Sequence, residues 1–95
     1  MSWINLGEVY YVVHRSLGAA QAEATITMLR PLVTLDAVTN ERVLAAARLK
    51  AAYPVAYADA FAVATATAHA AVLLTGNPEL TGRAMGCRVE NLARL

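Results

Sequence analysis

The chain has 95 residues and a net charge of +1, so it is long enough for one domain with one hydrophobic core. Its hydrophobic fraction is 58% and its charged fraction 16%, against ordinary values of about 45–50% and about 25%, which indicates that some apolar surface is buried against another chain. The balanced charge excludes a large basic surface for nucleic acid but does not exclude a local basic rim. The single cysteine, Cys87, excludes an internal disulfide and suits a reducing, cytoplasmic compartment.

The first third of the chain predicts two helices and a strand. Ser2 is a suitable N-cap for a helix over residues 3–17, in which apolar residues recur at helical spacing until a glycine ends it. A shorter, alanine-rich helix is predicted over residues 19–29 and stops before Pro31. The apolar run 32–35 then indicates a short buried strand.

The middle of the chain predicts two further helices. Asp36 is expected to cap a helix over residues 37–52. The inner stripe of this helix is predicted to consist of Val43, Leu44, Ala47 and Leu49. Alanine stands at every even position of the segment 56–70, which is the period of a strand. Because alanine is a strong helix former and a poor strand former, we predict a helix over residues 57–69, with a smooth alanine face that another backbone can approach closely.

The last part of the chain predicts a strand over residues 72–75, a turn at residues 76–78, a short helix over residues 79–85 and a weak strand over residues 87–92. Helices and strands therefore alternate along the chain. This order is typical of an α/β fold with a short parallel sheet.

The segment 60–78 carries no charged side chain and approaches the ~20 residues of a membrane-spanning helix. It consists mostly of alanine and threonine, however, and contains His69. Spanning helices rely on Leu, Ile, Phe and Val for insertion into the bilayer. We therefore predict no membrane segment.

Two carboxylates stand inside apolar helical patterns. Glu8 has Leu6 and Val9 as near neighbours, and Asp59 lies in the apolar stretch 57–66. An ionised carboxylate on a core face is costly unless a cation meets it, and a shared metal ion would explain both residues. Two alternatives stay open: Glu8 as an exposed helix residue, and Asp59 as an acid near a helix N-terminus, where the macrodipole stabilises negative charge.

Four phrases occur in a characteristic order. They are residues 2–11, Ala-Ala-Ala-Arg-Leu-Lys at 45–50, Tyr-Ala-Asp-Ala-Phe-Ala at 57–62 and Leu-Thr-Gly-Asn-Pro-Glu at 74–79. In these phrases the chain resembles the PIN domain family, close to the VapC ribonuclease toxins of bacterial and archaeal toxin–antitoxin pairs. The resemblance implies a three-layer α/β fold, with a short parallel sheet and helices on both faces, that occupies residues 1–95 as one domain.

The family pattern has four acidic positions around one or two Mg²⁺ or Mn²⁺ ions. Glu8 matches the second position, Asp59 matches the third, and Asn77 stands at the fourth, which is usually Asp. Thr75 matches a hydroxyl position beside the site. The first acid and its strand have no counterpart here, so the resemblance implies an N-terminally truncated domain with an incomplete site.

The fourth position has two readings. Asn77 precedes a proline and can be ordinary turn chemistry, or it can offer its neutral carbonyl oxygen to a metal. Glu79 would compensate in part for the missing charge, although a turn at the end of a strand is expected to point it elsewhere.

Two functions follow from this resemblance. The first is a Mg²⁺- or Mn²⁺-dependent endoribonuclease with Glu8 and Asp59 as metal ligands and with Thr75 and Asn77 beside them. The second is a catalytically inactive PIN remnant that oligomerises or binds an antitoxin. The expected partners are a second copy of the chain in a homodimer, an antitoxin protein and RNA, but no membrane. The PIN interpretation requires Glu8 and Asp59 to converge at the carboxyl edge of the sheet.

Overall fold

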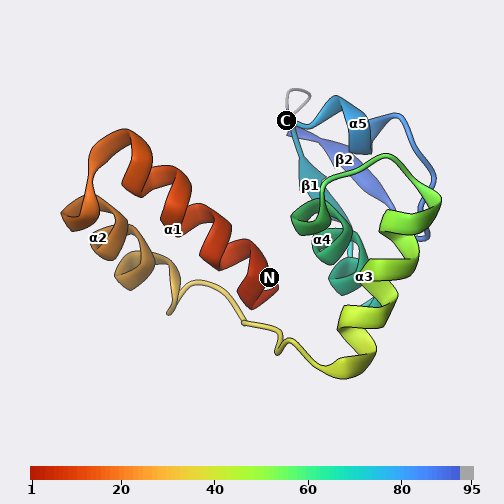
Figure 1. Cartoon of the computed structure of the whole chain (residues 1–95), viewed down its shortest axis with the longest axis horizontal. Coiled ribbons are helices and arrows are strands. Elements are labelled where there is room, and N and C mark those ends of the chain that lie inside the picture. Colours follow the sequence, from red (N-terminus) through yellow and green to blue (C-terminus); the bar gives the residue numbers. More distant parts are fainter. Residues whose placement is uncertain (93–95) are drawn as a thin grey trace. The chain divides into compact units, whose positions relative to one another are not determined.

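The computed structural model describes residues 1–92. Its elements in chain order are α1 (Trp3–Leu17), α2 (Ala19–Leu29), α3 (Asn40–Ala52), α4 (Tyr57–Ala68), β1 (Leu73–Thr75), α5 (Pro78–Thr81) and β2 (Val89–Asn91). They form two compact units, Met1–Val38 and Thr39–Leu95 (Figure 1). The predicted α/β fold with a short parallel sheet is confirmed.

The first unit is a hairpin of α1 and α2 (Figure 1). Ser2 caps α1 as predicted, since its side chain accepts a hydrogen bond from the backbone N–H of Ile4. Gly18 separates the two helices with φ 89°, a left-handed conformation that a residue without Cβ adopts easily. The Tyr10 hydroxyl donates a hydrogen bond of 2.9 Å to Glu23 and links α1 to α2.

The predicted strand at residues 32–35 is wrong. The segment begins in a turn, and Leu32, expected to be buried, is 73% exposed. A single bridge between Ser2 and Asp36 is the pairing formed here, through the backbone hydrogen bonds Trp3 N–H to Asp36 O and Asp36 N–H to Met1 O.

The second unit starts with α3, whose beginning differs from the prediction. Thr39, not Asp36, is the N-cap, and its hydroxyl accepts a hydrogen bond of 3.1 Å from the backbone N–H of Arg42. Leu44, predicted for the inner stripe, is 53% exposed, whereas Ala46 is fully buried. The apolar stripe of α3 is therefore rotated from the predicted one.

The core lies in this second unit, where α3 packs against α4. Its buried residues are Ala46, Val55, Ala60, Phe61, Val63, Ala64, Leu80 and Met85. Alanines of both helices belong to this core: Ala46 of α3, and Ala60 and Ala64 of α4. Lys50 closes the turn between the helices, because its ammonium group donates a hydrogen bond of 2.9 Å to the carbonyl of Val55.

The sheet has two parallel strands, β1 and β2, in the register Leu73↔Val89, Leu74↔Glu90 and Thr75↔Asn91. Both strands were predicted, with somewhat wider bounds. Helix α4 contacts β1, and α5 follows β1 after a turn of two residues. None of the helices among residues 1–92 is long and apolar enough to cross a membrane.

Candidate functional site

Asp59 lies in the first turn of α4. Its chain neighbours Ala60 and Phe61 are buried in the core, while the carboxyl side chain is half-buried at the margin. The N-cap position of α4 is Ala56, which offers no side-chain cap, so Asp59 supplies the negative charge in the first turn that the macrodipole favours. Packing of the core thus fixes the backbone that carries Asp59.

Thr75 and Asn77 lie at the carboxyl end of β1, where the chain turns into α5. Thr75 is the last residue of the strand, and its hydroxyl accepts a hydrogen bond of 3.1 Å from the backbone N–H of Asn77. Asn77 is the N-cap of α5, and Pro78 is the first residue of that helix. The carboxyl ends of parallel strands are the usual place for ligand sites in α/β folds.

The side chain of Asn77 joins the strand end to α4. Its Nδ2 donates a hydrogen bond of 3.0 Å to Oδ2 of Asp59. Its Oδ1 accepts a hydrogen bond of 3.0 Å from the backbone N–H of Glu79. Thr75, Asn77, Asp59 and Glu79, which we call the β1-end cluster, therefore gather residues from α4, β1 and α5 in one place.

The electrostatics of the β1-end cluster centre on Asp59. Burial raises the pKa of its carboxyl above the ordinary value, and the nearby negative charge of Glu79 raises it further. The hydrogen bond from Asn77 lowers the same pKa and offsets part of the rise. Glu79 is therefore close enough for its charge to act on Asp59. The expectation that the turn points its side chain elsewhere stays a prediction.

Glu8 lies on α1 and is half-buried. It belongs to the first compact unit, whereas the β1-end cluster belongs to the second. The convergence of Glu8 with Asp59 therefore stays a prediction. Sequence reasoning also passed over Asn91, which the parallel register sets opposite Thr75 at the same strand end; its only signal was its place at the end of the weak predicted strand.

The β1-end cluster contains the kind of ligand atom that a hard cation binds. Asp59, Glu79 and Thr75 offer oxygen atoms, which Mg²⁺ and Mn²⁺ prefer to nitrogen or sulfur ligands. They are few, however: the described part of the second unit holds no group of three or more Asp, Glu, His or Cys side chains able to hold a metal ion. A strong site would need a further carboxylate.

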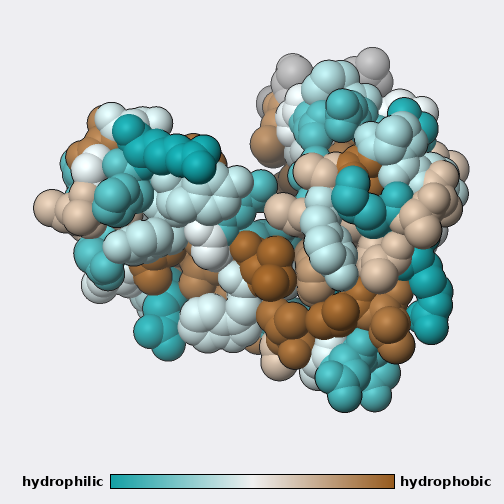
Figure 2. All heavy atoms as spheres, in the orientation of Figure 1, coloured by the Kyte–Doolittle hydropathy of each residue, from teal (hydrophilic) through white to brown (hydrophobic). Residues whose placement is uncertain are grey.

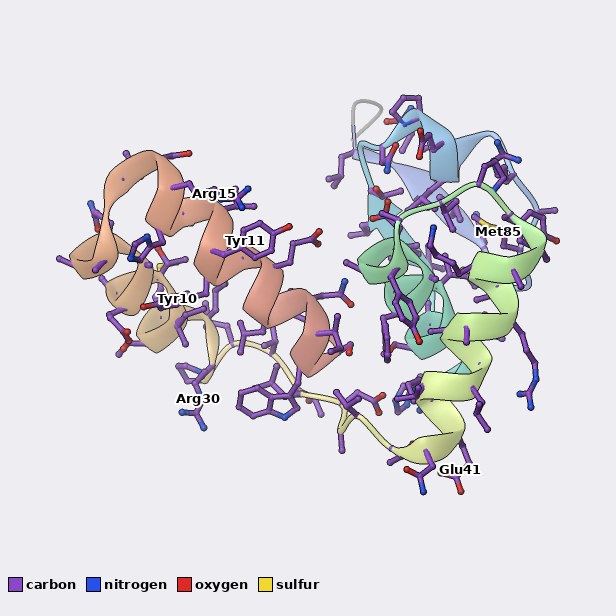
Figure 3. The ribbon with its side chains drawn as sticks, viewed as in Figure 1. Tyr10, Tyr11, Arg15, Arg30, Glu41 and Met85 are labelled. Carbon is purple, nitrogen blue, oxygen red and sulfur yellow. The ribbon has the colours of Figure 1, made fainter. Side chains whose placement is uncertain are left out.

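Three arginine side chains outside the β1-end cluster have different surroundings. Arg15 lies with its guanidinium 5.0 Å from the ring centre of Tyr11 on the same helix (Figure 3). Arg88 forms an exposed ion pair of 2.9 Å with Glu90. Arg48 lines a hollow of about 400 Å³ in the second unit, with the other lining residues Arg42, Ala45, Leu49, Ala64, Thr67, Ala68 and Met85. No member of the β1-end cluster lines that hollow.

Comparisons with known proteins agree with this architecture. The structure is similar to the crystal structure of DNA-bound VapBC from Salmonella typhimurium, with a TM-score of 0.77 and 22% sequence identity, over 95% of this chain and 72% of that chain. At this identity the likeness shows a shared fold. No curated protein sequence matches the chain. The sequence matches the PIN domain family over residues 1–84. Because this match extends over most of its length, the chain belongs to the PIN domain family.

Proposed function

We propose that the chain acts as a VapC-type, metal-dependent endoribonuclease, and that Glu8 and Asp59 hold the metal ion. The observation that carries this proposal is the β1-end cluster: the carboxylate of α4, the hydroxyl at the end of β1 and the amide at the start of α5 are joined by hydrogen bonds. These are the residues that match the third and fourth acidic positions and the hydroxyl position of the PIN pattern.

Each residue has a physical role in this proposal. A bound Mg²⁺ or Mn²⁺ ion supplies a water of lowered pKa and stabilises the leaving oxygen of a phosphodiester. Asp59 and Glu8 provide the anionic oxygens that such an ion requires. Thr75 holds the turn that carries Asn77, and Asn77 holds the carboxylate of Asp59 in one orientation.

RNA cleavage by the full chain tests this function. We expect purified protein to cut RNA with Mn²⁺ and to stop when EDTA is added. Asp59→Ala and Glu8→Ala should each reduce cleavage by more than the roughly 10- to 100-fold that loss of an outer-shell metal partner costs. Glu41→Ala is the matched control, because Glu41 is an exposed acid in the first turn of α3 (Figure 3). Equal inertness of the wild type and both variants would defeat the proposal.

The partners of this function are a second copy of the chain and an antitoxin protein, in the cytoplasm. The structurally similar protein is a VapBC complex. Large apolar side chains are exposed, among them Leu17 at 66%, Leu32 at 73% and Leu44 at 53%, and Figure 2 shows apolar side chains on the visible surface. This surface supports burial against another chain.

A second candidate function is an interaction module without catalysis, which binds an antitoxin or a second copy. The neutral Asn77 at the fourth acidic position favours it, since a cation held by fewer charges is bound more weakly. Metal-dependent cleavage that Asp59→Ala abolishes would exclude this candidate, and a strictly monomeric chain in gel filtration would remove its oligomeric form.

A further inference from the structure

Both ends of the Asn77 side-chain amide form hydrogen bonds. The backbone N–H of Glu79 can only donate, so the atom 3.0 Å from it must be the carbonyl Oδ1. The orientation of the amide is thereby fixed, and Nδ2 faces Asp59, with 3.0 Å between Nδ2 and Oδ2. The carbonyl oxygen that could have served a metal ion is instead used to cap α5.

Because of this orientation, the carboxylate of Asp59 faces an amide N–H at the start of α5. An amide N–H presents a partial positive charge to the carboxylate and occupies the approach to Oδ2. An aspartate at position 77 would present an oxygen instead, and two carboxylates at that distance repel each other unless a proton or a cation lies between them. Asn77 therefore gives Oδ2 of Asp59 a hydrogen-bond partner without a cation.

The amide cannot turn over freely. Rotation by half a turn would leave the N–H of Glu79 facing a donor and would set Oδ1 against the carboxylate of Asp59. The backbone is also held, because the N–H of Asn77 is bonded to the Thr75 hydroxyl and Pro78 restricts the residue before it.

We propose that the Asn77 side-chain amide takes the place of a divalent cation at Oδ2 of Asp59, so that the β1-end cluster binds Mn²⁺ or Mg²⁺ only weakly. The inference rests on the proposed function in one respect, because it takes Asp59 as the cation ligand. It identifies position 77 as the residue that sets the cation affinity of the site.

The test is a Mn²⁺ titration of the full chain by isothermal calorimetry, with no RNA present. Asn77→Asp keeps an N-cap acceptor for Glu79, removes the amide donor and adds one charge. We expect it to bind Mn²⁺ about tenfold more tightly than wild type or better, and Asn77→Asp with Asp59→Asn to lose this gain. An Asn77→Asp affinity equal to that of wild type would overturn the inference.

The matched control is Asn40→Asp, which makes the same charge change at the exposed first residue of α3. The chain reverses between α3 and α4, so this site lies roughly 18 Å along the helix axis from the turn that leads to Asp59. We expect the control to bind Mn²⁺ as wild type does. An equal gain in Asn40→Asp would assign the effect to net charge and overturn the inference.

Thermal unfolding provides a second readout. In EDTA, Asn77→Asp should melt at a lower temperature than wild type, and Mn²⁺ should raise its melting temperature more than that of wild type. If Asn77→Asp does not fold, Asn77→Ser takes its place: it keeps a capping hydroxyl, lacks the amide donor and should bind Mn²⁺ about two- to threefold more tightly than wild type. Unchanged binding by Asn77→Ser would then overturn the inference.

These outcomes separate the inference from the function. Tighter Mn²⁺ binding by Asn77→Asp without RNA cleavage by any variant supports the role of Asn77 and defeats the ribonuclease. Cleavage that depends on Asp59, together with equal Mn²⁺ affinities for wild type and Asn77→Asp, supports the ribonuclease and defeats the proposed role of Asn77.

Discussion

At the scale of single residues, Asp59 is the position where the structure departs most from a simple surface acid. Burial and the charge of Glu79 raise the pKa of its carboxyl, and the hydrogen bond from Asn77 offsets part of the rise. The sequence indicated a costly carboxylate at this position, because Asp59 interrupts an apolar helical pattern. The family resemblance set Asn77 beside Asp59, but that the amide nitrogen faces the carboxylate could not be predicted, since Asn77 is eighteen residues away along the chain.

The raised pKa predicts a specific pH dependence of stability. Between the ordinary value of 3.8 and the higher folded value, the native state binds more protons than the unfolded chain, so the free energy of unfolding falls as pH rises through that window. Above this pH window the loss in the free energy of unfolding caused by ionised Asp59 stays constant. Asp59→Asn, which does not titrate, should therefore be more stable than wild type at pH 7, and the difference should vanish below about pH 3.8.

Urea unfolding in EDTA at pH 7 and pH 3.5 measures this difference. The control is Glu41→Gln, an exposed acid in an equivalent helical position, which should change the free energy of unfolding little at either pH. A wild type more stable than Asp59→Asn at pH 7 would contradict the prediction.

At the scale of elements, the helix termini show where local signals suffice and where they do not. The bounds of α1 and α2 agree with the predictions from Ser2, Gly18 and Pro31, because each of these signals acts on adjacent backbone. Asp36 and Thr39 are both good caps by residue type, and the sequence alone favoured the wrong one. The backbone of Asp36 is instead paired with the start of the chain, so α3 begins after Thr39.

Thr39 should therefore contribute measurably to stability. Thr39→Ala removes the acceptor of the Arg42 N–H and should lower the free energy of unfolding by about 1 kcal/mol. Thr39→Ser keeps the hydroxyl and should stay within about 0.5 kcal/mol of wild type. Chemical denaturation of the three proteins measures this, and an equal loss in both variants would show that the cap is not the cause.

At the scale of the whole molecule, the chain consists of two compact units. The core cluster is confined to the second unit, with Phe61 as its largest side chain, while the only tryptophan, Trp3, lies in the first. We propose that residues 1–95 form a single cooperative domain, as the PIN resemblance implied. The two units then have to unfold together.

Phe61→Ala tests this cooperativity. Loss of a buried phenylalanine should cost about 3–5 kcal/mol. In a single domain, the unfolding transition followed by Trp3 fluorescence shifts as far as the one followed by circular dichroism. Leu44→Ala, at an exposed position in the same unit, should shift neither by much. If the unfolding transition followed by Trp3 fluorescence does not shift in Phe61→Ala, the two units unfold independently.

The sequence by itself determined the helices, the two strands of the parallel sheet and the membership of the PIN family, because helical periodicity, cap residues and ordered phrases are properties of neighbouring residues. Only the tertiary structure decided that residues 32–35 form a turn and irregular backbone and that the Asn77 amide turns its N–H toward Asp59. Both depend on which distant backbone or side chain takes up a hydrogen-bonding group. These hydrogen-bond partners come together only when the elements pack, so no local sequence pattern predicts them.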